Sequence, residues 1–154
     1  DDLFFDWVAI KKSMQQLYFK KIDIIFPSKV SWNGGASEGY SIYYKCLEKI
    51  FELNPSLKKK SKDLEFIEPY IKNKNFKYKT FRGMRYEIKK ARLTLDYNED
   101  YVLLKKISKQ NGSFNERKNI NSFLKKNSNL LKINFHKNLD WKKKQNKIIS
   151  KNKL

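Results

Sequence analysis

The sequence predicts an α/β fold in which helices cover a sheet. Segments whose apolar residues recur at helical spacing alternate with short strand-like runs, and this alternation is typical of α/β proteins. Proline and glycine are scarce, at 3 and 5 of 154 residues, so most of the chain is expected to fold. A chain of this length can form one domain with a core of its own.

A helix and a strand are predicted at the start of the chain. Asp1 or Asp2 can cap a helix that ends near residues 20–21. Residues 22–27 then form a short buried strand that stops at its final proline. The apolar residues of the helix recur three and four apart, at Leu3, Trp7, Ile10, Met14 and Leu17.

The middle of the chain continues the alternation. Residues 31–39 form a loop whose glycines permit backbone angles or close approaches that side chains forbid. An amphipathic helix follows over residues 40–53, and a shorter, proline-containing helix over residues 63–74. Residues 76–81 alternate apolar and polar side chains, which favours a half-exposed edge strand over a base-stacking surface.

Residues 91–107 combine a strand and a helix. Residues 93–95 are strand formers that stop at Asp96, and helical spacing begins near residue 98. We expect this strand to lie inside the sheet, with Asp96 at its carboxyl end facing a cleft. A carboxylate there is well placed to hold Mg²⁺, because open α/β sheets gather ligands at that edge. It could equally cap the helix, and the spacing leaves both interpretations open.

The C-terminal third ends in a basic segment. A helix is predicted near residues 114–127, then a brief extended run at residues 130–134. Residues 137–154 are rich in lysine and are expected to be solvated. The single histidine, His136, is more often a surface or packing residue than a catalytic base in such a position. Common catalytic motifs, such as phosphate-binding glycine loops, zinc clusters and nucleophile elbows, are absent from the sequence.

The charge balance is strongly basic. Lysine and arginine number 35 against 16 acids, for a net charge of +19. This charge suits a polyanion, but the lysines are scattered over the predicted helices, which favours a compositional bias. A nucleic-acid partner is therefore not expected. The apolar runs are too short to span a bilayer, and the single cysteine, Cys46, fits a reducing compartment. We expect a cytoplasmic protein.

A family resemblance follows from the order of several motifs. They are "DIIFP" at 23–27, "SEGYSIYYKCLEKI" at 37–50, "EFIEPYI" at 65–71 and "ARLTLDYNED" at 91–100. In this order they resemble the C-terminal half of cytidylyltransferases of the spore-coat polysaccharide type. Those enzymes are related to the ones that make CMP-activated sialic acid and CMP-activated Kdo. The resemblance spans most of residues 1–136.

The resemblance implies a fold and an activity. The fold would be a layered, Rossmann-like sheet of the nucleotide-diphospho-sugar transferase type. Residues 1–136 would form the C-terminal portion of that domain, and residues 137–154 a basic tail. The domain would be incomplete, because the family's N-terminal half carries the triphosphate loop and the base pocket. The enzyme would use Mg²⁺ to transfer CMP from CTP to an acidic or amino sugar for surface polysaccharide, and this chain alone is not expected to turn over.

The resemblance also implies roles for four residues. Asp96 would bind the metal, and Arg92 would be a catalytic cation that offsets phosphate charge. Glu38 and Gly39 would face the acceptor sugar. Three positions depart from the family pattern, which has proline, threonine and proline where this chain has Ser37, Glu68 and Asn98.

Two other functions remain open from the sequence. The chain could be a non-catalytic basic module that binds nucleic acid through its lysines. It could also be a structural remnant that forms a homodimer through the region from residue 114 onward.

Overall fold

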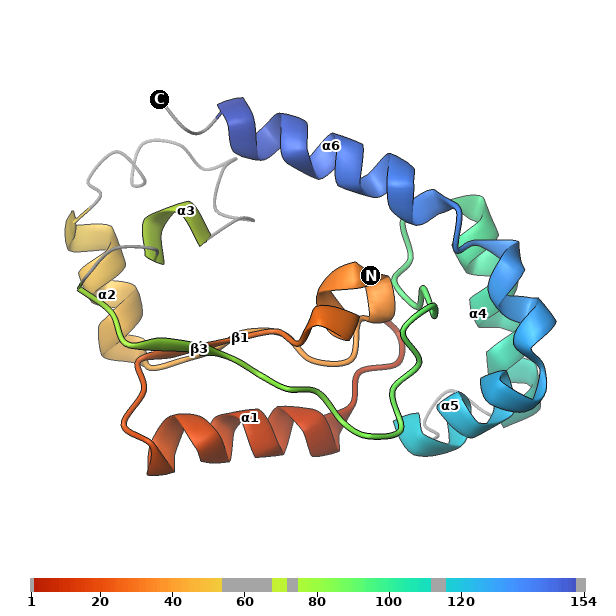
Figure 1. The fold of residues 1–154 in the computed structure, drawn as a ribbon, viewed down its shortest axis with the longest axis horizontal. Helices are drawn as coiled ribbons and strands as arrows, with labels where there is room; N and C mark the ends of the chain where they lie inside the picture. The colour runs from red at the N-terminus through yellow and green to blue at the C-terminus, as the bar shows by residue number, and fades with distance from the viewer. Residues whose placement is uncertain (1, 54–67, 72–74, 112–115, 152–154) are drawn as a thin grey trace.

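A small mixed sheet lies at the centre of the fold (Figure 1). The computed structural model describes residues 2–53, 68–71, 75–111 and 116–151. Its three strands are ordered β2-β1-β3. The bounds are Ile24–Phe26 for β1, Ser41–Ile42 for β2 and Tyr78–Thr80 for β3. The β1 strand pairs antiparallel with β2 and parallel with β3, so the predicted strands at 22–27 and 76–81 are confirmed, the latter at the sheet edge.

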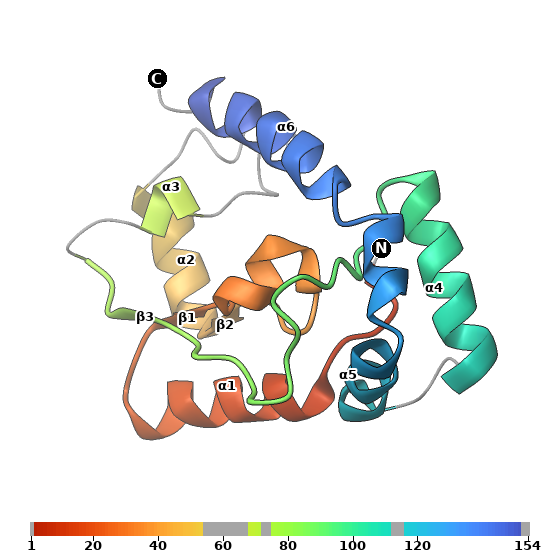
Figure 2. The same ribbon diagram turned by 45° about the vertical axis from the view of Figure 1, so that its right-hand side comes forward.

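Helix α1, Trp7–Phe19, lies along one face of the sheet (Figures 1 and 2). It begins later than predicted, because Asp6 rather than Asp1 or Asp2 caps it. Asp6 Oδ1 accepts the backbone N–H groups of Val8 and Ala9 at 3.0 and 3.1 Å. This cap satisfies N–H groups that have no partner within the helix.

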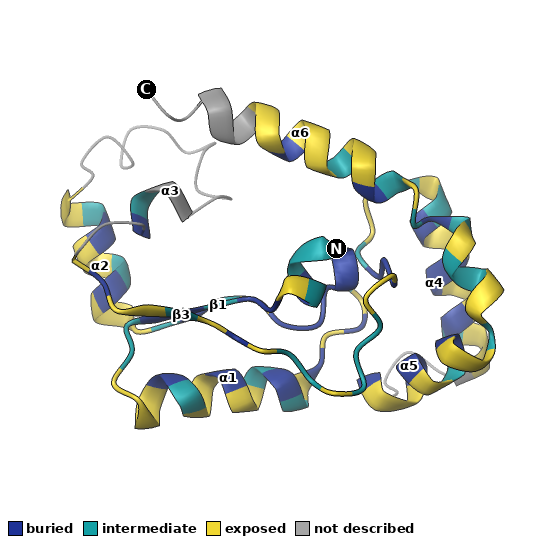
Figure 3. Ribbon diagram, in the orientation of Figure 1, coloured by how far each residue is buried: buried dark blue, intermediate teal, exposed yellow. Residues whose placement is uncertain are grey.

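The face that α1 buries differs from the prediction. Ala9, Ser13 and Leu17 are buried, whereas Trp7 and Met14 are each 58 % exposed. The physical reason is close approach: the Ser13 and Ser41 hydroxyl oxygens lie 2.8 Å apart, linking the helix to β2. Small side chains allow this contact, and buried and exposed positions alternate along the helix (Figure 3).

The remaining helices group at the two ends of the sheet (Figures 1 and 2). At one end lie α2, Tyr44–Leu53, and α3, Glu68–Ile71; the rest of the predicted 63–74 helix falls outside the described residues. At the other end pack α4, Asn98–Asn111; α5, Arg117–Lys126; and the 3₁₀ helix η3, Ser128–Ile133. The η3 helix replaces the predicted extended run at 130–134, since its backbone forms short-range turns instead of finding a strand partner.

The predicted strand before Asp96 does not join the sheet. Leu93 N donates to Gly34 O at 2.7 Å, and Thr94 forms an isolated antiparallel bridge with Asp2. Ala91 and Leu93 are buried in the cluster formed with α4 and α5. The segment is therefore extended, and it is buried at Ala91–Leu93 but exposed at Leu95. The prediction that it lies inside the sheet is wrong.

The basic C-terminal segment forms helix α6, Lys137–Lys151. It runs back from the α4–α5 end on the side of the sheet away from α1 (Figures 1 and 2). Asn138 and Gln145 are buried, although most of its described lysines are exposed. The expectation of a solvated tail is thus wrong for one face of the helix. Within the described ranges, no helix combines the length and apolar character needed to cross a bilayer.

Candidate functional site

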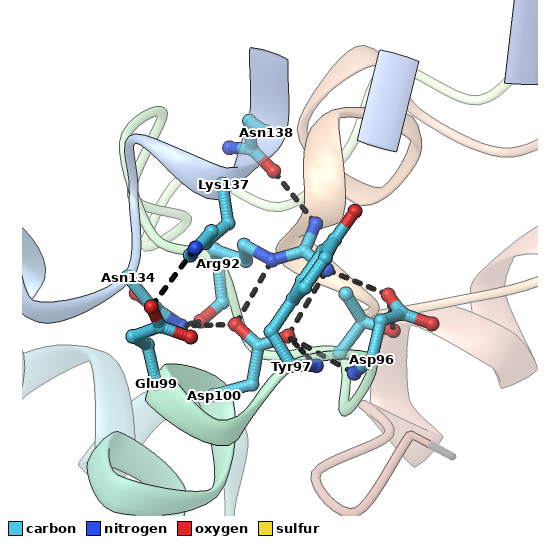
Figure 4. A network of polar contacts seen from close by, with 9 residues as sticks. Arg92, Asp96, Tyr97, Glu99, Asp100, Asn134, Lys137 and Asn138 are labelled. Carbon is cyan, nitrogen blue, oxygen red and sulfur yellow. Dashed lines mark hydrogen bonds and ion pairs between the residues drawn. The ribbon is translucent and has the colours of Figure 1, made fainter. Parts of the chain in front are cut away.

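A buried arginine, Arg92, forms a network of polar contacts within the motif at residues 91–100 and with residues beyond it (Figure 4). Arg92 is 0 % exposed. Its Nε and Nη2 donate to Asp100 Oδ1 and Oδ2 at 2.9 and 3.0 Å, a two-point contact that fixes both groups. Nη2 also donates to Asp96 Oδ2 at 2.6 Å, and Nη1 donates to Asn138 Oδ1 at 2.9 Å. One guanidinium therefore holds α4, the Asp96 turn and α6 together.

Asp100 stabilises the start of α4. Its Oδ2 accepts the backbone N–H groups of Asp96 and Tyr97, each at 3.0 Å. Asp100 is the third residue of α4, and a carboxylate at that position commonly reaches back to the residue before the helix. The contacts of Asp96 go elsewhere, to Arg92 and to the Thr94 hydroxyl at 3.3 Å. The structure thus assigns the capping role to Asp100.

Asp96 is accessible enough to contact a ligand. Its side chain is 32 % exposed, and the contacts just described engage Oδ2, which leaves Oδ1 for an external group. Two carboxylates around one guanidinium leave a net negative charge in the Arg92 network. The described residues contain no group of three or more Asp, Glu, His or Cys that could hold a metal ion. Mg²⁺ often takes only one or two carboxylates beside phosphates and water, so Asp96 fits as a single ligand.

The geometry favours a positioning role for Arg92. Its complete burial prevents contact with a phosphate unless the network opens. Its 2.6 Å contact instead orients Asp96. The catalytic role predicted for Arg92 therefore stays a prediction, and this arrangement does not favour it.

A pocket of about 270 Å³ lies beside this network. It is formed by the loop after β1, the segment before Asp96 and α6. Its aromatic and polar lining includes Trp32, Glu38, Tyr40, Thr94, Trp141 and Gln145. Asp96 follows Thr94 by two residues but is not among the described residues that line the pocket. Aromatic faces combined with carboxylate, hydroxyl and amide groups suit a ligand that has both apolar faces and hydroxyl groups.

Glu38 and Gly39, the two residues predicted to face the acceptor sugar, differ in their surroundings. Glu38 lines the pocket but is only 3 % exposed, and its carboxylate accepts Ser28 N and Ser37 Oγ, each at 2.6 Å. Its carboxylate therefore shapes the loop. Gly39 is exposed, and a Cβ there would meet no described heavy atom within 4 Å. Gly39 is not among the described lining residues, although its neighbour Tyr40 is.

Several pocket residues were not predicted from the sequence. Trp32 and Tyr40 flank the glycines of the predicted loop, and their rings lie edge to face with centroids 6.4 Å apart. Trp141 and Gln145 come from the segment expected to be solvated. The available signal was Trp141 inside a lysine-rich run, because a large aromatic side chain in such a run tends to pack against other residues of the fold.

A second buried charge cluster, formed by Arg117 and Glu87, contacts the loop after β1. Arg117 Nη1 donates to Phe4 O at 2.8 Å, and Nη2 donates to Gly35 O. Glu87 Oε2 lies 3.8 Å from Nη2, with side chains 4 % and 1 % exposed for the glutamate and the arginine. Burial raises the pKa of Glu87, whereas the nearby Arg117 charge opposes that rise. Arg117 thereby ties α5 to the N-terminal segment and to the loop.

No protein-family model, curated protein or solved structure matches this chain.

Proposed function

We propose that this chain is the C-terminal portion of a cytoplasmic, Mg²⁺-dependent cytidylyltransferase. The complete enzyme transfers CMP from CTP to an acidic or amino sugar used in surface polysaccharide. The fold of the complete domain is a layered, Rossmann-like sheet to which the small sheet described above contributes. The proposal extends the motif resemblance of residues 1–136.

One observation supports this proposal most directly. The pocket brings together three of the motif segments, because Pro27 comes from 23–27, Glu38 and Tyr40 from 37–50, and Thr94 from 91–100. Asp96, two residues beyond Thr94, is anchored by Arg92 and partly exposed. An acceptor pocket next to a single accessible carboxylate is the arrangement that metal-assisted nucleotidyl transfer requires.

The reaction assigns a task to each part. A sugar hydroxyl oxygen attacks the α-phosphorus of CTP and forms a new oxygen–phosphorus bond. The bond to the bridging oxygen breaks, pyrophosphate leaves with its electron pair, and the hydroxyl proton passes to solvent. Mg²⁺ neutralises phosphate charge when bound, and Asp96 would supply one of its oxygen ligands. Trp32 and Trp141 would contact the apolar faces of the sugar, while Thr94 and Gln145 would bond its hydroxyls. Arg92 would keep Asp96 in place.

The proposal is tested in the protein that includes the coding sequence upstream of Asp1. The assay follows CTP-dependent pyrophosphate release with a panel of acidic and amino sugars. We expect Asp96→Asn to lower turnover by at least about 100-fold, because it removes a charged ligand. The matched control is Asp140→Asn, at an exposed position of α6, which should keep full turnover. Full activity of the Asp96 variant would remove its metal role, and inactivity with every sugar and nucleotide would overturn the proposed function.

Sugar binding can be followed separately from turnover. The chain has three tryptophans, of which Trp32 and Trp141 line the pocket and Trp7 is exposed on α1. An acceptor sugar should change the tryptophan fluorescence saturably. Trp7→Phe should retain that change, whereas Trp141→Phe should reduce it. Equal responses in both variants would place the sugar elsewhere.

A further inference from the structure

A second pocket, of about 300 Å³, lies where the loop after β1 meets the start of α6. Its polar lining consists of Asn33, Lys89, His136, Asn138 and Lys142. None of the described residues that line it is acidic. It shares no described lining residue with the 270 Å³ pocket of the proposed function. The concentration of cations and amides without a carboxylate gives this pocket a positive potential.

Asn138 presents a fixed donor in this pocket. It is only 6 % exposed, and its Oδ1 accepts from Arg92 Nη1 at 2.9 Å. A guanidinium can only donate, so the oxygen of Asn138 must face Arg92 and the NH₂ group must face away from it. Figure 4 shows this orientation of the side chain. The buried contact therefore preorients two N–H donors, which mobile surface lysines alone could not do.

We propose that this pocket binds the phosphate group of a small ligand. The amide of Asn138 supplies directional hydrogen bonds, and Lys89 and Lys142 supply charge. Glu99, an acid at the start of α4, is already paired with Lys137 at 2.9 Å. A phosphate offers several acceptor oxygens and negative charge, so it matches this set of donors better than a neutral ligand does. The proposal does not depend on CTP or on an acceptor sugar.

The single histidine provides a direct probe. Because His136 lines the pocket and is the only histidine, the proton on its Cε1 gives a single resonance to follow by NMR. Inorganic phosphate is added at fixed pH and constant ionic strength, so that general screening stays unchanged. We expect a saturable shift of this resonance. Acetate serves as the comparison, and equal affinity for acetate would overturn the assignment to phosphate.

Two variants and one control test the donors. Asn138→Asp keeps an oxygen for Arg92 but removes both N–H donors and adds negative charge, so phosphate affinity should fall by about tenfold or more. Lys142→Gln should weaken phosphate binding by about threefold, because an exposed cation contributes less. Lys143→Gln is the matched control, since this exposed neighbour does not line the pocket.

The Lys143→Gln control also distinguishes phosphate binding in this pocket from a general effect of surface charge. Equal losses in the Lys142 and Lys143 variants, or a shift that never saturates, would overturn the proposal. Circular dichroism checks that Asn138→Asp is folded, and the two lysine variants decide the question if it is not. These outcomes leave the proposed cytidylyl transfer untouched, because that function is tested by pyrophosphate release.

Discussion

Gly34 lies directly against the side chain of Asn138. A Cβ built on Gly34 would stand 2.6 Å from Asn138 Oδ1, and Gly34 has a φ of +89°. Both facts restrict this position to glycine, because side chains avoid left-handed backbone angles and no atom fits at that distance. At this position the loop after β1 can therefore contact Asn138 and Arg92 only through a bare backbone.

Gly34→Ala is expected to destabilise the protein by about 2 kcal/mol or more, from backbone strain and displacement of Asn138. The matched control is Gly39→Ala, where a Cβ meets open space among the described residues. It should change the free energy of unfolding by less than about 0.5 kcal/mol. Urea denaturation measures both variants, and equal effects would contradict the described loop geometry.

Asp100 and Asp96 should differ in their importance for stability. Asp100→Ala removes the fully buried partner of Arg92, so it should cost about 3–5 kcal/mol. Asp96→Ala affects a partly exposed carboxylate and should cost no more than about 1 kcal/mol. Chemical unfolding of the two alanine variants gives the comparison. A larger cost at Asp96 would show that Asp96, and not Asp100, anchors the network.

Glu87 should make stability fall as pH rises. Because burial raises the pKa of Glu87 in the folded protein, the folded state holds this proton more tightly than the unfolded chain does. The stabilisation is fully present below the unfolded pKa of about 4.3, and it is lost as the pH rises through the folded pKa. Glu87→Gln removes this dependence, so the variant should gain stability relative to the parent between about pH 4 and pH 7.

The measurement is urea unfolding of parent and variant at several pH values. Glu48→Gln, at an exposed position of α2, is the control for loss of a carboxylate. A stability difference for Glu87→Gln that stays constant with pH would show that this carboxyl keeps its ordinary affinity for protons, and one that falls would show that folding lowers its pKa. Either result would contradict the prediction.

Cys46 should react slowly with thiol reagents in the folded protein. Its side chain is buried, and burial together with the charge of Asp23 raises its pKa to about 11. Only roughly one thiol in a thousand would then be ionised at pH 8, and the thiolate is the reactive form. Iodoacetamide should label the native protein at least about 100-fold more slowly than the urea-unfolded protein. The rate of iodoacetamide reaction with glutathione, measured with and without urea, corrects for the effect of urea on the reagent. Equal corrected rates for the native and unfolded protein would contradict the burial of Cys46.

Local patterns in the sequence were sufficient to predict several elements. The β1 and β3 strands lie within the predicted runs, and α4 begins at Asn98 as its spacing indicates. Helix α5 lies within the predicted 114–127 segment. These elements could be read because backbone preferences and apolar periodicity act over a few neighbouring residues.

The sequence by itself determined that residues 93–95 are extended and that a carboxylate, Asp96, follows them. That this carboxylate is accessible came from the structure, where its side chain is 32 % exposed. Only the tertiary structure decided their partners. Arg92 bonds Asn138, 46 residues away, and Trp141 joins a pocket with Glu38. Periodicity likewise predicted α1 but not its buried face, because that helix is apolar on more than one side. Which side is buried depends on how closely the sheet approaches, and the small side chains of Ala9 and Ser13 permit that approach.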